Sequence, residues 1–98
     1  MTISRILIRD KMSNLAETFP ALQAAPGIRP WDATILDEWG ASGDPGHGSV
    51  CAVRFVLSVW NPKLTYESGR FDLHEALGVW DEENTQAFRN WINDPWWP

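Results

Sequence analysis

Seven of the 98 residues are tryptophan, and the placement of these large side chains limits what the chain can fold into. Most of them lie at the expected ends of helices or on apolar stripes. A small protein needs bulky rings at such places to exclude water from its interior. We therefore expect Trp39, Trp60, Trp80 and Trp91 to belong to a tryptophan-rich core.

The last two tryptophans, Trp96 and Trp97, end the chain outside any periodic pattern. They either fold back as a lid over the rest of the fold or remain exposed and bind a partner. Because two exposed indoles would promote aggregation, the lid is the interpretation we favour.

A chain of 98 residues with one cysteine forms a single domain without an internal disulfide, which is typical of the reducing cytoplasm. Hydrophobic residues make up 44% of the chain and charged residues 21%, which is the composition of a globular protein. The net charge of −5 argues against direct nucleic-acid binding and against attachment to a membrane surface, since both need clustered cations. No apolar run approaches the roughly 20 residues of a membrane span.

The charge is unevenly distributed along the chain. Residues 1–11 contain three basic residues against one acidic residue, a net charge of +2, and Met12 follows directly. We expect residues 1–11 to form a basic N-terminal tail or a peripheral segment, and residues 12–98 to form a single helical domain. Residues 67–98 contain seven acidic and two basic residues, so the C-terminal third carries a net charge of −5.

The first half of the domain contains signals for two helices. Residues 13–25 have Ser13 or Asn14 as a possible N-cap, and Pro20 predicts a kink or a restart within this segment. Asp32 can cap a second helix, and Gly40 stands where a C-terminal glycine in the left-handed conformation is expected. A glycine-rich loop follows over residues 40–49.

The second half begins with the most apolar stretch, residues 50–60. Its β-branched residues would suit a buried strand, but the spacing of its two polar residues and its helical neighbours favour a buried central helix. Asp72 and Asp81 can each cap a further helix, and residues 93–95 end the last one. The sequence therefore predicts an all-α fold, a compact bundle of four or five short helices.

No pattern typical of a catalytic or cofactor site is present, and we expect neither a catalytic residue nor a bound cofactor. His47 and Cys51 are four residues apart and could share a metal ion, but a metal site needs three or four ligands and His74 is the only other histidine. We therefore expect no metal site. Cys51 begins the most apolar segment, which is typical of a buried structural cysteine rather than a nucleophile.

A resemblance covers residues 50–98. Three segments are similar to a group of small bacterial and phage proteins that carries no known function: FVLSVWNP (55–62), Phe71–Leu73 with Ala76–Leu77 and Trp80–Asp81, and Ala87–Phe88 with Trp91 and the closing PWWP. The resemblance implies a bacterial or phage origin and implies nothing catalytic.

Size, acidity and the lack of catalytic motifs favour a non-enzymatic protein-binding module. One form would be a phage or mobile-element inhibitor of a host defence nuclease, of the anti-CRISPR kind, because an acidic face can occupy a basic nucleic-acid channel. The expected partner is a protein, for instance a nucleic-acid-binding host protein. The expected contact residues are Glu75, Asp81, Glu82, Glu83 and Asp94, with Trp96 and Trp97 as aromatic anchors.

Three alternatives remain open. The acidic residues could form a merely solvated face. The chain could act as a homo-oligomeric structural or housekeeping protein through a tryptophan-rich surface. It could also be a small enzyme or ligand-binding protein that uses His47, Cys51, Arg54 and His74 near the glycine loop.

Overall fold

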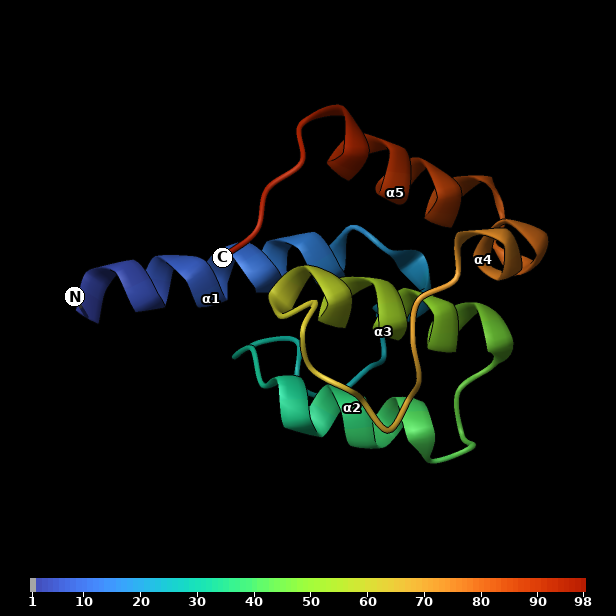
Figure 1. The fold of residues 1–98 in the computed structure, drawn as a ribbon, viewed down its shortest axis with the longest axis horizontal. Helices are drawn as coiled ribbons and strands as arrows, with labels where there is room; N and C mark the ends of the chain where they lie inside the picture. Colours follow the sequence, from blue (N-terminus) through green and yellow to red (C-terminus); the bar gives the residue numbers. More distant parts are fainter. Residues whose placement is uncertain (1) are drawn as a thin grey trace.

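Helix α3 (His47–Trp60) runs through the centre of a helical bundle, and the other elements pack around it (Figure 1). The computed structural model describes the backbone of residues 2–98 and the side chains from Leu7 onward. Half of the residues of α3 are buried, namely Cys51, Ala52, Val53, Phe55, Val56, Leu57 and Val59. The prediction of a central helix over residues 50–60 is thus confirmed, with a start three residues earlier.

The elements follow in the order α1 (Thr2–Glu17), the short 3-10 helix η1 (Pro20–Leu22), α2 (Ala33–Ala41), α3, α4 (Leu73–Val79) and α5 (Glu82–Asn93). Residues 2–98 contain no strand, so the predicted all-α bundle is confirmed. The radius of gyration is 12.5 Å, close to the value of about 13 Å for a compact chain of this length. Within the described part of the chain, no helix is long and apolar enough to cross a bilayer.

Helix α1 differs from the prediction at its beginning. The predicted start at Ser13 or Asn14 is wrong, because the helix runs without a break from Thr2. Ser13 is buried, and its hydroxyl donates to the carbonyl oxygen of Ile28 instead of capping a helix. The boundary placed after Lys11 therefore lies inside α1. Its first turns extend beyond the body of the bundle (Figure 1), and the side chains of Leu7, Arg9 and Asp10 are exposed.

Three aspartates cap the later helices as predicted. The carboxylate of Asp32 accepts from the backbone N–H of Ile35, and that of Asp72 from the backbone N–H of Glu75, both at 3.1 Å. Asp81 accepts from the backbone N–H of Asn84 at 2.9 Å. These bonds satisfy amide groups that the first helical turn leaves without a partner, so each short helix has a defined start.

Gly40 does not have the predicted role at the end of α2. It lies inside the helix, is buried, and has no positive φ. A Cβ atom at this position would lie 2.9 Å from Cγ1 of Val53 on α3 and 3.1 Å from Cβ of Ser68. The glycine is therefore needed because α2 and α3 approach each other closely here.

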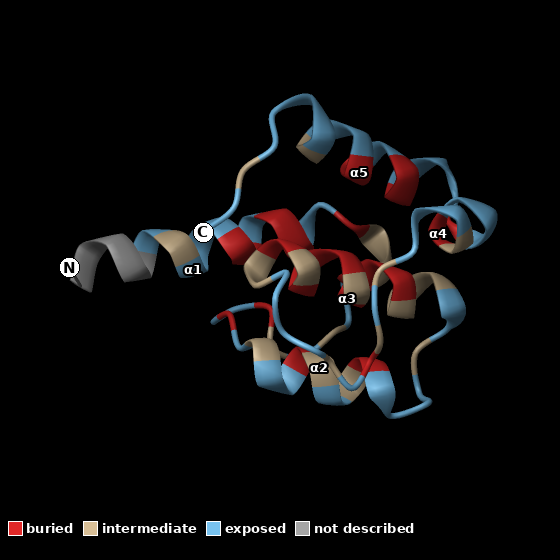
Figure 2. Ribbon diagram, viewed as in Figure 1, coloured by how far each residue is buried: buried red, intermediate tan, exposed pale blue. Residues whose placement is uncertain are grey.

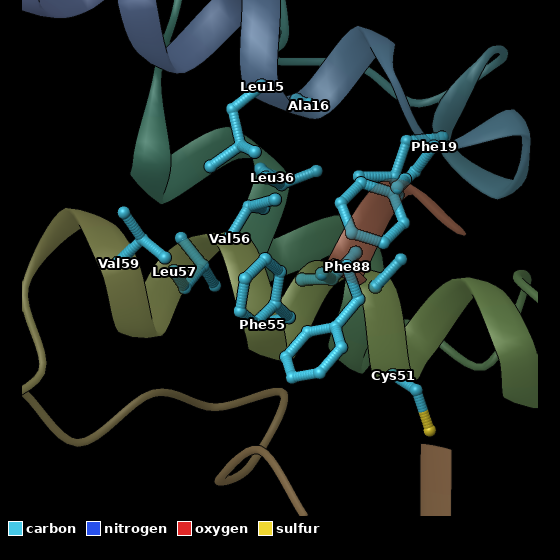
Figure 3. Close-up of a cluster of buried hydrophobic side chains, with 14 of the residues drawn as sticks. Leu15, Ala16, Phe19, Leu36, Cys51, Phe55, Val56, Leu57, Val59 and Phe88 are labelled. Carbon is cyan, nitrogen blue, oxygen red and sulfur yellow. The ribbon is translucent and has the colours of Figure 1, made fainter. Parts of the chain in front are cut away.

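The centre of the core is a phenylalanine rather than a tryptophan. The ring of Phe55 lies between 5.2 and 5.6 Å from the rings of Phe19, Phe71, Phe88 and Trp91. Figure 3 shows Phe55 with Phe19 and Phe88. These separations and the tilted or edge-on angles are those of favourable aromatic pairs. The rings come from the segment after α1, the segment before α4 and helix α5, so Phe55 joins the N-terminal and C-terminal parts of the chain.

The tryptophans surround this centre. Trp80 is buried as predicted, and its indole N–H donates to the carbonyl oxygen of Gly48 at 3.0 Å. Trp31 is also buried, and its ring packs against that of Trp60 at 5.6 Å. The other three predicted core members, Trp39, Trp60 and Trp91, are half-buried and pack against the margin of the core.

Helix α5 is attached to the bundle by a buried asparagine. The side-chain amide of Asn84 donates to Asp81 at 2.8 Å, and its oxygen accepts from the backbone N–H of Ala21 at 3.0 Å. One face of α5 is buried with Ala87 and Phe88, and the other face is exposed (Figure 2). This arrangement leaves a long polar helix surface at the edge of the molecule.

The segment between α3 and α4 is held by side chains rather than by regular structure. The carboxylate of Asp37 on α2 accepts from the backbone N–H groups of Glu67 and Ser68, at 3.0 and 2.8 Å. Arg54 of α3 donates from Nε to the carbonyl oxygen of Ser68 at 2.6 Å. The segment is therefore fixed around Ser68, and this fixes the direction from which the chain enters α4.

Candidate functional site

Three side chains with metal-binding or nucleophilic chemistry meet where the first turns of α3 and α4 come together. His47 and Cys51 are four residues apart on α3, so they lie on the same face of the helix. Glu75 reaches this face from the first turn of α4. One ligand atom from each of the three lies within 4.8 Å of the other two. We refer to His47, Cys51 and Glu75 as the His–Cys–Glu cluster.

The carboxylate of Glu75 is the centre of the polar contacts. One oxygen, Oε2, lies 2.7 Å from Nε2 of His47. The other oxygen, Oε1, accepts from Nη1 of Arg54 at 2.8 Å. Each carboxylate oxygen is therefore held by a side chain of α3, and the cluster joins α4 to α3 through polar contacts.

Arg54 fixes the position of this carboxylate. Its guanidinium also donates to the carbonyl oxygen of Ser68 and packs against Gly69, where a Cβ atom would lie 3.1 to 3.3 Å from three guanidinium atoms. Gly69 has a φ of 100°, a conformation that side chains other than glycine rarely adopt. The guanidinium is therefore held from two sides, and it orients Glu75 toward His47.

Cys51 forms the buried end of the cluster. The residue is 1% exposed, whereas the side chains of Glu75 and His47 are 35% and 54% exposed. Its sulfur points away from the labelled aromatic side chains of the core (Figure 3). The three groups thus form a gradient from a buried thiol to an imidazole at the surface.

Burial raises the pKa of the Cys51 thiol above its usual value, and the nearby carboxylate of Glu75 raises it further. The positive charge of Arg54 acts in the opposite direction and does not outweigh these effects. The thiol is therefore protonated at neutral pH, which disfavours a role as an activated nucleophile.

The structure brings together three of the four residues that the sequence suggested for a small-molecule site, namely His47, Cys51 and Arg54. The fourth, His74, is exposed and is not part of the cluster. The third possible ligand is Glu75, which the sequence analysis assigned to the acidic face. Glu75 and Cys51 are 24 positions apart in the sequence, so only the packing of α4 against α3 shows that their side chains lie close together.

The five acidic residues proposed for partner contact do not form one surface. Glu75 is engaged in the cluster, and Asp81 caps α5. Glu82 is exposed, and its oxygen Oε1 lies 2.7 Å from Nη1 of Arg89. Glu83 and Asp94 are exposed, and no ion pair among the described side chains includes them. The carboxylates that face water are therefore at the two ends of α5.

The two terminal tryptophans behave differently from each other. Trp96 is half-buried against the core, and Nζ of Lys11 on α1 lies 4.3 Å from the centre of its ring. Trp97 is 58% exposed, and its ring meets that of Trp91 edge-on at 5.2 Å. Trp96 thus folds back as a lid would, while Trp97 presents an indole surface to solvent.

Comparison with known proteins adds no assignment to these observations: the chain matches no family model, no curated protein and no solved structure.

Proposed function

We propose that this protein is a non-enzymatic binding module that recognises a basic surface of another protein. The binding surface consists of the exposed side of α5 and the segment after it, with Glu82, Glu83, Ile92, Asp94 and Trp97. We refer to these five residues as the acidic C-terminal surface.

The observation that carries this proposal is the exposure of two large apolar side chains at the C-terminal end of α5 and in the segment after it, on either side of Asp94 in the sequence. Ile92 is 49% and Trp97 is 58% exposed, and Asp94 lies between them in the sequence. Tryptophan is among the residues that contribute most to binding energy at protein interfaces. An apolar anchor with a charged rim is the usual composition of a transient interface.

Charge selects the class of partner. The whole chain has a net charge of −5, and residues 67–98 account for all of this excess of acidic residues. A basic surface would be attracted over a long range, whereas a second copy of this chain would be repelled. Nucleic-acid-binding proteins carry such surfaces. Inhibition of a phage-defence nuclease is accordingly the form of this function that we would test first.

Site-specific photo-crosslinking tests the proposal. A benzophenone amino acid is placed at Asn93, an exposed position on α5 beside Ile92 and Asp94, and a second protein carries it at Thr34, exposed on α2. Both proteins are irradiated in a bacterial lysate at low and high salt. We expect an adduct from position 93 alone, weaker at high salt, whose crosslinked peptide lies in a lysine- and arginine-rich region of its protein.

Two charge variants complete the design. The triple variant E82Q/E83Q/D94N should lose most of the adduct, whereas E38Q/D44N/E67Q removes three exposed carboxylates elsewhere and should retain it. Equal adducts from positions 93 and 34, or equal adducts from both triple variants, would contradict the proposal. Crosslinks between two copies of this chain would indicate the homo-oligomer instead.

A further inference from the structure

We propose that the His–Cys–Glu cluster binds one divalent transition-metal ion of the zinc class. This site is separate from the acidic C-terminal surface, so either proposal can fail without the other.

The ligand atoms are of the type that such ions prefer. Zinc is bound in proteins by cysteine sulfur, histidine nitrogen and carboxylate oxygen, and the cluster offers one of each. A thiolate and an imidazole together disfavour magnesium and calcium, which prefer oxygen ligands only. The donor set therefore points to zinc and to ions that replace it, such as cobalt.

The spacing of the three groups is close to that of a tetrahedral site. Zinc–ligand bonds of about 2.0–2.3 Å place neighbouring ligand atoms roughly 3.5 Å apart. In the structure, Nε2 of His47 and Oε2 of Glu75 are 2.7 Å apart, and no pair of ligand atoms exceeds 4.8 Å. To reach the tetrahedral spacing, the imidazole and the carboxylate must separate slightly and the more distant ligand atoms must approach each other, which the exposure of His47 allows. Because the side chains of His47 and Glu75 are 54% and 35% exposed, a water molecule can supply the fourth ligand.

The surroundings of Glu75 are those of a positioned ligand. Ligating carboxylates and histidines usually have outer partners that fix their orientation. Arg54 holds the oxygen Oε1 of Glu75, at 2.8 Å, and so leaves Oε2 directed at His47. Arg54 is here a positioning residue. Its charge opposes a cation, but the thiolate and the carboxylate together supply two negative charges against the two positive charges of the ion.

Binding exchanges a proton for the metal. The Cys51 S–H bond breaks, the sulfur–metal bond forms, and the thiol proton leaves to solvent.

Cobalt titration of the full chain tests the site directly. Stripped protein is titrated with Co²⁺, and the thiolate-to-cobalt charge-transfer absorption and the visible bands of a tetrahedral ion are recorded. We expect saturation at one equivalent and displacement of the cobalt by Zn²⁺. Thermal unfolding with and without Zn²⁺ provides a second measurement, since an ion that binds only the folded chain raises the melting temperature.

The variants separate this site from adventitious binding. His47→Ala changes an exposed side chain and should weaken Co²⁺ binding by more than about tenfold, because loss of even an outer partner costs that much. Cys51→Ser should abolish the charge-transfer band. His74→Ala removes the only other histidine, next to Glu75 in the sequence, and should bind as the unmodified chain does.

Absence of the charge-transfer band in the unmodified chain would overturn the proposal, as would equal affinities of His47→Ala and the unmodified chain. If circular dichroism shows that Cys51→Ser does not fold, the comparison of Co²⁺ affinity between His47→Ala and His74→Ala decides the question alone.

Discussion

Replacement of Phe55 by alanine should remove much of the stability of this protein. Phe55 is 3% exposed and carries no polar group, so the change leaves no buried donor or acceptor without a partner. The lost ring is surrounded by four others, whose centres lie between 5.2 and 5.6 Å away on three other helical elements or segments. These rings are held by separate parts of the backbone and cannot collapse fully into the space.

The expected loss follows from this geometry. A buried phenylalanine replaced by alanine costs about 3–5 kcal/mol, and a site that cannot collapse lies in the upper part of this range. A domain of this size has a free energy of unfolding of about 5–15 kcal/mol, so Phe55→Ala should fold only marginally. At about 4–8 °C per kcal/mol, the melting temperature should fall by more than roughly 12 °C.

Urea unfolding followed by tryptophan fluorescence and by far-ultraviolet circular dichroism measures the loss. Phe55→Leu keeps most of the volume and should cost less than about 2 kcal/mol. Leu64→Ala, at a position 55% exposed, is the surface control and should change stability by less than about 0.5 kcal/mol. A loss below about 1 kcal/mol for Phe55→Ala would refute the reasoning, because it would mean that the four rings do not enclose this side chain.

Two further substitutions test other parts of the fold. Gly40→Ala should lower the free energy of unfolding in urea by about 1–3 kcal/mol, because the added methyl group meets Val53 at 2.9 Å. The control is Gly78→Ala on α4, where the added methyl group meets no atom within 4 Å. This control should be neutral or stabilising in the same measurement. The second test concerns the cap of α5. Hydrogen bonds from Asn84 lower the pKa of Asp81 in the folded chain. The carboxylate therefore contributes its full stabilisation above the pKa of an unfolded aspartate, about 3.9. This stabilisation is lost as the pH falls through the lower pKa of the folded chain. Asp81→Asn should therefore lose less stability than the unmodified chain between pH 5 and pH 2, and an identical loss in urea midpoint would contradict this linkage.

The helices that the sequence predicts well are those with local signals. Asp32, Asp72 and Asp81 each precede an apolar stripe, and each accepts a hydrogen bond from an amide three residues later. The buried helix over residues 50–60 follows from its length and from the position of Arg54 and Ser58. The residues that form such signals lie within one or two helical turns of each other, so the sequence alone is enough to recognise them.

Where tertiary contacts decide, the prediction fails. Ser13 has the chemistry of an N-cap, but Ile28 competes for its hydroxyl, and the helix continues through it. Gly40 stands where a C-terminal glycine is common, but the approach of Val53 explains it instead. The same holds for the candidate metal site. The spacing of His47 and Cys51 is visible in the sequence, whereas the position of Glu75 depends on how α4 packs.

The segment between α3 and α4 also determines where this chain tolerates changes of length. Its backbone is fixed at Glu67 and Ser68 by Asp37 and Arg54, so an inserted residue there would displace α4 and the carboxylate of Glu75. Residues 63–65 are exposed and lie outside these contacts. Relatives of this protein should therefore vary in length over residues 63–65, which is also the place for an inserted epitope or a fluorescent reporter.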